Sequence, residues 1–418
     1  MLSATSNTKN YPITFFIGSG IVVVFLILFP IRAAADEAKG FSGQWETTYG
    51  LMTLEQKDDY VSGQYLMDGA RCSIEGKVES RRLQFKYREP KASGEGWFEL
   101  NADGDQFSGS WRENGASVWM SWVGTRAKDL RDTFAGVWET SFGRMRLVEN
   151  DDGEVRGIYA LEGVSTLKGK KDNDRLRLQY HEKNISGEAW FQLKDEGSTF
   201  EGEWRADGQE QWRKWTGRRL SSRPGRVWLV VIEARWENSL DDKEFSLGEM
   251  LKSFFDRTPN VEVRRRFFTD AASLQRWLKE VAYFPEPTVV TIATHGVEDG
   301  LLVDGTTISA KTVAEGLKYA ANLKALHFSS CSVMKDRFGK EVFKALADAG
   351  VKTAVSGYRN PVDWAASALF EMTYFDLLLS RGMNAPEASA AALNMFPIAG
   401  KDPIKNVPIL PGGFEILR

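Results

Sequence analysis

Short bursts in which apolar and polar residues alternate fill the first part of the chain, from residue 41 to residue 127. Gly, Asp, Asn and Ser separate the bursts, and this period-two pattern is typical of half-buried β-strands. The pattern predicts eight short antiparallel strands, which close their own edges as a small up-and-down barrel. The expected strands are 44–49, 51–57, 61–67, 72–79, 82–89, 94–101, 105–113 and 117–126.

The same pattern returns about 93 residues later, from residue 134 to residue 220. Phe41-Ser-Gly-Gln-Trp45 recurs as Phe134-Ala-Gly-Val-Trp138, and each copy closes with Trp-x-x-Trp-x-Gly-x-Arg. A repeat of this length indicates that a whole structural unit was duplicated. The sequence therefore predicts two tandem β-barrels.

Each repeat holds five of the fourteen tryptophans, at matching positions. They either pack in the core and at the barrel end or form an aromatic platform for sugar, peptide or wall polymer. The opening Gly-x-Trp and the late arginine, Arg126 or Arg219, resemble the calycin pattern of lipocalin- and avidin-like barrels. Because such barrels are filled by side chains or hold one small ligand, we expect modules for recognition, spacing or regulation.

A different pattern follows the basic linker 218–226. Val227–Ala234 is continuously apolar, and similar runs alternate with stretches of helical periodicity. Uninterrupted apolar runs are typical of parallel strands covered on both faces. Residues 226–396 thus predict an α/β domain with a mostly parallel sheet, so the chain is a multidomain α+β protein. The expected strands are 227–234, 261–268, 288–294, 323–330 and 351–357, with a hairpin at 301–308 and helices at 246–256, 270–283, 310–321, 336–349, 363–381 and 385–395.

Two reactive residues stand directly after buried strands of this domain. His295 follows the third strand and Cys331 follows the fourth. Active sites of open α/β sheets lie beyond the carboxyl ends of the strands. If these two strands are neighbours, about 4.8 Å apart, the imidazole and the thiol emerge side by side.

This pair has the chemistry of acyl transfer. A cysteine thiolate is a nucleophile, and a nearby imidazole generates it and then protonates the leaving amine. Gly296 lets a substrate carbonyl approach closely, and the N–H groups of Gly296 and Cys331 can bind an oxyanion. The predicted catalytic residues are His295 and Cys331.

The two blocks His295-Gly296 and Ser329-Ser330-Cys331 resemble those of caspase-like cysteine peptidases. More closely, the order of elements over residues 227–396 resembles the CHAT family, including the hairpin at Gly300–Gly305 and the segment that ends at Asp363. The resemblance implies a caspase-like fold and a Cys-His dyad endopeptidase that needs neither a metal nor another cofactor.

The resemblance also concerns substrate binding. The family often has an acidic pair near the position of Asp363, whereas here Trp364 follows. By the resemblance, Asp363 is a substrate-binding residue, and it then favours a basic residue at the scissile position.

The N-terminus, residues 1–35, has the features of a targeting segment. Tyr11–Ile31 is almost wholly apolar, Lys9 precedes it and Ala33-Ala34-Ala35 follows. It is either a secretory signal peptide cut after Ala35 or a retained membrane anchor. Both alternatives place the rest of the chain outside the cytoplasm, in the periplasm or secreted.

Composition and the remaining motifs exclude several functions. The formal net charge of −3 gives no basic field for nucleic acid. The chain has two cysteines, which exclude a disulfide scaffold and a cysteine-rich zinc module. We expect no bond between Cys72 and Cys331, since pairing would block the nucleophile. The absence of Gly-x-Ser-x-Gly and of a phosphate-binding Gly-x-x-x-x-Gly-Lys loop disfavours a serine hydrolase and a nucleotide enzyme.

Two functional hypotheses remain. The first is an exported cysteine endopeptidase that cleaves a protein or peptide, with barrels that recruit substrate or a regulator. The second is a non-catalytic protein that binds a ligand or surface polymer through its barrels and keeps a peptidase-like domain for interaction. The Pro- and Gly-rich tail, residues 397–418, either covers the site or packs nearby.

Overall fold

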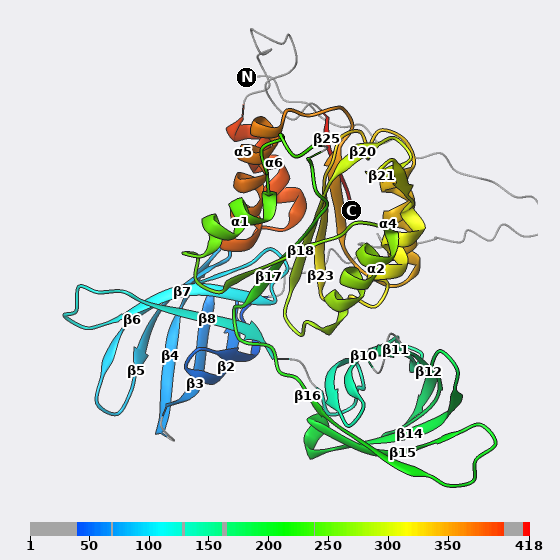
Figure 1. The fold of residues 1–418 in the computed structure, drawn as a ribbon. Coiled ribbons are helices and arrows are strands. Elements are labelled where there is room, and N and C mark those ends of the chain that lie inside the picture. Colours follow the sequence, from blue (N-terminus) through cyan, green and yellow to red (C-terminus); the bar gives the residue numbers. More distant parts are fainter. Residues whose placement is uncertain (1–39, 68–69, 128–129, 161–164, 238, 397–412) are drawn as a thin grey trace, which may run out of the picture. The chain divides into compact units, whose positions relative to one another are not determined.

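The computed structural model of the chain describes residues 40–67, 70–127, 130–160, 165–237, 239–396 and 413–418. Within these ranges it contains two closed barrels, a six-stranded sheet and a three-stranded sheet (Figure 1). The predicted tandem repeat and the two β-barrels are therefore confirmed. The expected targeting segment, 1–35, lies outside the described residues. No helix within the described ranges is long and apolar enough to cross a membrane.

The first repeat folds as an eight-stranded antiparallel barrel in which each strand pairs with its neighbours in sequence and β1 closes onto β8. Burial alternates as the sequence pattern requires: in β5, Leu83, Phe85 and Tyr87 point inward and the residues between them are exposed. The strands are β1 Gly43–Thr47, β2 Gly50–Lys57, β3 Tyr60–Met67, β4 Ala70–Glu79, β5 Arg82–Arg88, β6 Ser93–Leu100, β7 Gln106–Glu113 and β8 Met120–Arg126.

The second repeat forms the same barrel, closed between β16 and β9. Its strands are β9 Gly136–Thr140, β10 Gly143–Glu149, β11 Glu154–Tyr159, β12 Ser165–Asp172, β13 Arg175–His181, β14 Ser186–Lys194, β15 Thr199–Ala206 and β16 Arg213–Arg219, with the short helix η1 Asp195–Gly197 before β15. His181 lies on the exposed side of β13.

Aromatic side chains fill the interior of both barrels. Trp122 packs edge-on against Tyr49, Tyr65 and Phe98, with ring centroids 5.1–5.2 Å apart. Its counterpart Trp215 makes the matching contacts in the second barrel. Three of the five tryptophans in each repeat belong to or pack against these cores, and the other two lie on the outside. The inner set is Trp45, Trp111, Trp122, Trp138, Trp204 and Trp215, and the outer set is Trp97, Trp119, Trp190 and Trp212.

The Gly-x-Trp and the late arginine of each repeat meet at one end of the barrel. The guanidinium of Arg126 lies 4.2 Å from the ring centroid of Trp45 and donates to the carbonyl oxygens of Gly40 and Gly104. Arg219 covers Trp138 in the same way at 4.1 Å. The arginine therefore satisfies backbone carbonyls that the closing strands leave open.

The C-terminal domain is built on a six-stranded sheet in the order β18-β17-β19-β23-β24-β25. All pairings are parallel except that of β24 with β25. The prediction of a mostly parallel sheet is confirmed. The strands are β17 Val227–Glu233, β18 Val261–Phe267, β19 Thr288–Ala293, β23 Leu323–Ser329, β24 Ala354–Tyr358 and β25 Phe414–Leu417.

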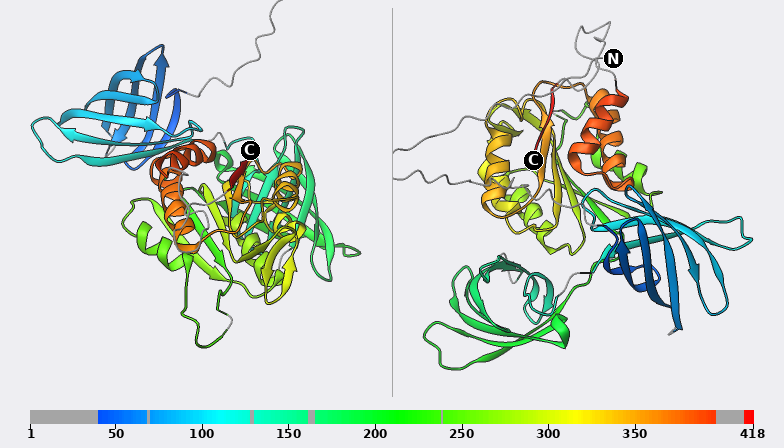
Figure 2. Two further views of the ribbon diagram at one scale, coloured as in Figure 1. Left: turned by 90° about the horizontal axis from the view of Figure 1, so that it is seen from above. Right: turned by 180° about the vertical axis from the view of Figure 1, so that it is seen from behind.

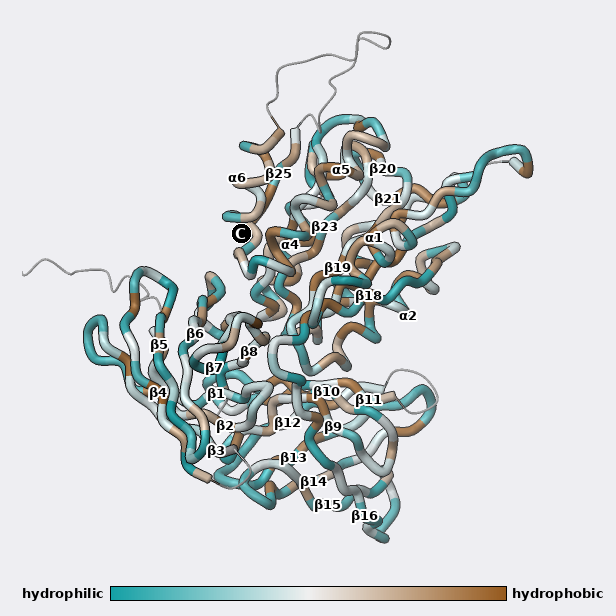
Figure 3. The backbone as a smooth tube through the Cα atoms, turned by 90° about the vertical axis from the view of Figure 1, so that its left-hand side faces the viewer, coloured by the Kyte–Doolittle hydropathy of each residue, from teal (hydrophilic) through white to brown (hydrophobic). Residues whose placement is uncertain are grey.

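Helices cover both faces of this sheet (Figure 2). Val230 and Ile232 of β17 face the core under α2, α3 and α4, whereas Leu229 and Val231 face the core under α1, α5 and α6. Figure 3 accordingly shows the central strands as predominantly hydrophobic and the barrel strands as mixed. The helices are α1 Leu247–Phe255, α2 Ala271–Glu280, α3 Ala310–Leu317, α4 Phe338–Asp348, α5 Trp364–Phe375 and α6 Ala385–Met395, with short turns η2 Val281–Tyr283 and η3 Asp376–Ser380.

A small antiparallel sheet stands at the end of β19. It consists of β20 His295–Val297, β21 Gly300–Val303 and β22 Thr306–Ile308. The predicted hairpin is present, and Asp304 and Gly305 adopt the positive φ angles, +45° and +72°, that a tight two-residue turn requires. The sequence pattern did not indicate β20 or β25. Of the tail, residues 397–412 lie outside the described residues, and β25 pairs with β24 instead of crossing the site.

Candidate active site

The two strands that precede His295 and Cys331 are neighbours. Strands β19 and β23 pair in parallel, and Ala293 at the end of β19 lies opposite Ser329 at the end of β23. The chain continues from these ends into His295 and Cys331. The condition on which the predicted dyad depended is therefore met.

His295 and Cys331 line one cavity of about 460 Å³ at this carboxyl edge. His295 is exposed and Cys331 is half-buried. The ring of Trp236 packs edge-to-face on the imidazole, with centroids 5.0 Å apart, and so restricts its orientation. The other lining residues are Lys243, Glu244, Phe245, Leu247, Ser329, Ser330, Val362, Trp364, Ser367, Ala368 and Glu371.

Gly296 brings the two backbone segments together. A Cβ atom added at this position would lie 3.0 Å from the amide nitrogen of Cys331 and closer still to its carbonyl oxygen. Real Cβ atoms do not approach backbone atoms so closely, so only glycine fits here without displacing Cys331. Close approach of the Gly296 and Cys331 backbones is the arrangement that an oxyanion site made of their two N–H groups needs.

The thiol of Cys331 lies in a locally constrained turn. The backbone N–H of Val362 donates to its sulfur at 3.5 Å. The next residue, Ser332, has a φ of +61°, in the left-handed region that costs a non-glycine residue about 1–2 kcal/mol. Backbone strain of this kind clusters at functional sites.

The structure places Asp363 at the N-terminus of helix α5. Its carboxylate caps helix α5, accepting hydrogen bonds from the N–H groups of Ala365 and Ala366 at 3.0 and 3.2 Å. The neighbours Val362 and Trp364 line the cavity, but Asp363 does not. Because aspartate at this position satisfies otherwise unpaired N–H groups of the first turn, helix capping accounts for it.

Two acidic residues line the cavity, the exposed Glu244 and the buried Glu371 of α5. Glu371 is fully buried, and its Oε1 accepts a hydrogen bond from the Tyr358 hydroxyl at 2.8 Å. Burial, followed by the charge of Glu371, raises the pKa of Tyr358 far above its ordinary range, so this hydroxyl remains a donor. Among the described residues, nothing donates a hydrogen bond to the second oxygen, Oε2.

The spacing of residues in the sequence of α5 could have indicated that Glu371 is buried. Ser367, Glu371 and Tyr374 share one face of α5 at helical spacing, and all three are buried. A carboxylate in phase with buried residues is a functional candidate, because burying a charge is costly unless it is paired and hydrogen-bonded.

The remaining histidines and the second cysteine lie elsewhere. His327 is fully buried in β23, where Nδ1 lies 3.0 Å from the Ser356 hydroxyl and Nε2 lies 3.2 Å from Glu371 Oε1. Cys72 is buried in the first barrel, and no disulfide joins it to Cys331. Within the described ranges, no group of three or more His, Cys, Asp or Glu side chains is arranged to hold a metal ion.

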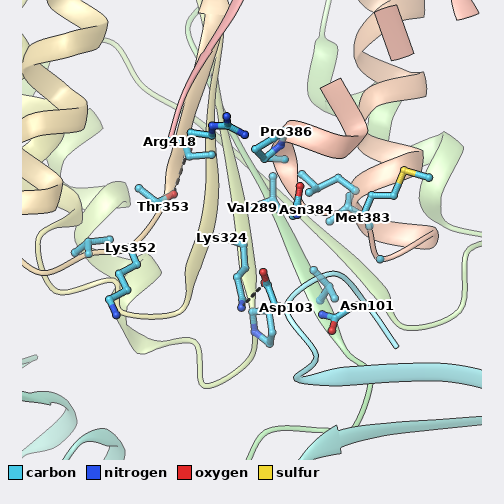
Figure 4. Close-up of a pocket in the computed structure, with 18 of the residues that line it drawn as sticks. Asn101, Asp103, Val289, Lys324, Lys352, Thr353, Met383, Asn384, Pro386 and Arg418 are labelled. Atoms are coloured by element: carbon cyan, nitrogen blue, oxygen red, sulfur yellow. Dashed lines mark hydrogen bonds and ion pairs between the residues drawn. The ribbon is translucent and has the colours of Figure 1, made fainter. Parts of the chain in front are cut away.

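A larger cavity of about 720 Å³ lies at the opposite edge of the sheet, where β19 and β23 begin (Figure 4). Val289, Lys324 and Asn384 are among its lining residues, and neither histidine nor cysteine is. Of these two cavities, the one at the carboxyl edge therefore contains His295 and Cys331. A scan of the chain against protein-family models found no match, and a search of curated proteins found no relative.

Proposed function

We propose that the chain is an exported cysteine endopeptidase of the caspase-like, CHAT type. The observation that carries this proposal is that His295 and Cys331 line the same cavity, with Gly296 against the backbone of Cys331. The resemblance of the motifs and the order of elements support it. Export follows from the targeting segment expected at residues 1–35.

The proposed mechanism needs only groups at this edge of the sheet. His295 takes the proton of Cys331, and the thiolate attacks the carbonyl carbon of the scissile peptide bond. The N–H groups of Gly296 and Cys331 stabilise the oxyanion. His295 then gives the proton to the leaving amine as the C–N bond breaks, which leaves a thioester on Cys331. Water activated by His295 hydrolyses the thioester, releases the acid and restores the thiol.

The cavity supports a preference for a basic residue on the amino side of the scissile bond. Phe245 and Trp364, whose ring centroids are 4.0 Å apart, provide apolar walls for a long aliphatic stem. Glu371 supplies a buried carboxylate with one oxygen still able to accept hydrogen bonds. A guanidinium or ammonium group that reaches Glu371 gains a charge-assisted hydrogen bond in a dry site. In this proposal Glu371 has the role first given to Asp363.

Thiol reactivity tests the dyad without knowledge of the substrate. In a Cys72→Ala background Cys331 is the single cysteine of the chain. We expect iodoacetamide to modify it at neutral pH about tenfold or more faster than in Cys72→Ala/His295→Ala, because the imidazole generates the thiolate. Equal rates in the two variants would contradict the dyad and favour the non-catalytic binding protein.

A matched control separates a specific effect of His295 from general damage. His181→Asn/Cys72→Ala removes an exposed imidazole of β13, which does not line the cavity. The reactivity of Cys331 should remain near that of Cys72→Ala in this control, provided that circular dichroism shows the fold to be retained.

A further inference from the structure

The outside of the second barrel carries a hollow of about 710 Å³ over strands β12 to β15. Charged and aromatic side chains surround it, with five cationic groups against two carboxylates. The cationic residues are Lys168, Lys170, Arg175, Arg177 and Arg205, the acidic ones are Glu154 and Glu188, and the aromatic ones are Trp190 and Trp212.

Two of the arginines are fixed on tryptophan rings. The guanidinium of Arg175 lies 4.4 Å from the ring centroid of Trp190, and that of Arg205 lies 4.7 Å from the centroid of Trp212. Arg205 also donates from Nε to Glu188 at 2.6 Å. Stacking and ion pairing restrict these side chains before any ligand arrives, so little conformational entropy is lost on binding.

The strand register places further like charges side by side. Lys170 of β12 lies directly opposite Arg177 of β13, and Arg177 lies opposite Trp190 of β14. Neighbouring strands are about 4.8 Å apart, and like charges in directly opposite positions destabilise a sheet. Glu154 of β11 lies opposite Lys170 on its other side, whereas no carboxylate lies directly opposite Arg177, so a bound anion would relieve the repulsion there.

The first barrel shares this arrangement of aromatic rings and arginines but lacks part of the charge. Arg82 covers Trp97 at 4.1 Å and Arg112 covers Trp119 at 4.6 Å, as their counterparts do in the second barrel. The register gives Glu75, Gln84 and Lys86 as the equivalents of Lys168, Arg177 and Gln179, so the first barrel lacks two of these cations and has one that the second barrel lacks. The barrel fold is therefore compatible with either set of residues, and the additional cation of the second barrel needs another explanation.

We propose that this hollow, lined as described above, binds an acidic polysaccharide, a glycan chain that carries carboxylate or sulfate groups. Guanidinium groups held in place match these planar or tetrahedral anions. Single-stranded nucleic acid fits less well, since it needs free aromatic faces on which its bases stack, and here arginines cover the indoles. The proposal does not depend on the peptidase activity.

The duplication supplies a matched test. In the full-length protein, Lys168→Glu/Arg177→Gln converts the second barrel to residues that the first barrel already carries. Binding of fluorescently labelled heparin oligosaccharides should weaken about tenfold or more, and its dependence on salt concentration should become shallower. The reverse exchange, Glu75→Lys/Gln84→Arg, should strengthen binding.

Neutral dextran and a single-stranded oligonucleotide of matched charge complete the experiment. We expect dextran not to bind and the oligonucleotide to bind more weakly than heparin. Heparin binding that is absent, or that is unchanged by Lys168→Glu/Arg177→Gln, would overturn the proposal. Tighter binding of the oligonucleotide than of heparin would overturn the assignment to a glycan.

Discussion

Gly296 shows how a single residue permits the arrangement of the candidate site. A side chain at this position would collide with the backbone of Cys331, and the N–H groups of these two residues are proposed to bind the oxyanion. Glycine is needed here because the backbone of Cys331 lies so close to Gly296, and not because Gly296 has an unusual φ angle. A small substitution should therefore affect reactivity as well as stability.

We predict that Gly296→Ala destabilises the α/β domain by about 1–3 kcal/mol, as overpacking does, and slows alkylation of Cys331. Thermal unfolding and the alkylation rate measure the two effects. Gly305→Ala is the control: its φ of +72° makes alanine unfavourable in the hairpin turn, but no atom lies within 4 Å of the added Cβ. Gly305→Ala should lower stability and leave the alkylation rate unchanged, and a similar slowing in both variants would contradict the assignment.

The assignment of substrate binding to Glu371 and the assignment to Asp363 predict opposite effects of mutation on substrate choice. Glu371→Gln keeps an acceptor for the Tyr358 hydroxyl but removes the charge, so cleavage after Arg and Lys should fall about tenfold or more relative to cleavage after uncharged residues. Asp363→Asn keeps the helix cap and should leave the preference unchanged. The measurement is kcat/KM for paired peptides that differ at that one residue. A preference lost in Asp363→Asn and kept in Glu371→Gln would restore the first assignment.

These residues also show what the sequence could establish at this scale. His295 and Cys331 were identified because both follow buried strands, where the topology leaves little freedom of placement. The role of an acidic side chain on α5 depends on which face of the helix lines the cavity. The packing of α5 against the sheet determines this face, so the sequence alone does not show it. Asp363 and Glu371 are eight residues apart on or beside the same helix, and only the fold distinguishes a cap from a cavity residue.

At the scale of elements, the buried Glu233 joins β17 to the start of α1. Its carboxylate accepts hydrogen bonds from the Ser246 hydroxyl at 2.7 Å and from the N–H of Gly248 at 3.3 Å. Arg265 of β18 lies 3.4 Å away. Burial nevertheless raises the pKa of Glu233 above its ordinary value, and the hydrogen bonds and Arg265 offset only part of that effect.

The raised pKa of Glu233 gives a pH dependence with a definite sign. The folded domain binds this proton more tightly than the unfolded chain, so the stabilising contribution is complete at low pH and is lost as pH rises through the raised pKa. The opening free energy of wild-type β17 relative to that of Glu233→Gln should therefore be highest below the ordinary glutamate pKa of 4.5 and should fall as the pH rises above it. Hydrogen exchange of the β17 amides in both proteins at each pH measures this difference, and a rise would contradict the account.

The elements that the sequence predicted well are those with a clear pattern of apolar and polar residues. Every barrel strand and every buried strand of the α/β domain was expected within a few residues, and α6 has the expected bounds, 385–395. The misses are short elements: β20 has three residues and β25 has four. Too few residues carry the pattern in such strands, and they form because a neighbouring edge is available for pairing.

At the scale of the whole molecule, duplication preserved the barrel and changed its surface. The capped tryptophans Trp45 and Trp138 and the filled interiors are common to both copies. The cationic groups outside differ, as Glu75 and Lys168 show. The tryptophans therefore form two sets: the inner ones belong to the core, and the outer ones lie beneath arginines.

The central claim, that Cys331 and His295 cleave peptide bonds, is tested most directly by cleavage of a peptide library. The full-length protein, Cys331→Ala and Cys72→Ala are compared, since the two variants remove the two cysteines of the chain in turn. We predict cleavage by the wild type and by Cys72→Ala, mainly after basic residues, and a loss of at least about a thousandfold in Cys331→Ala. Cleavage that persists undiminished in Cys331→Ala would contradict the assignment of the nucleophile.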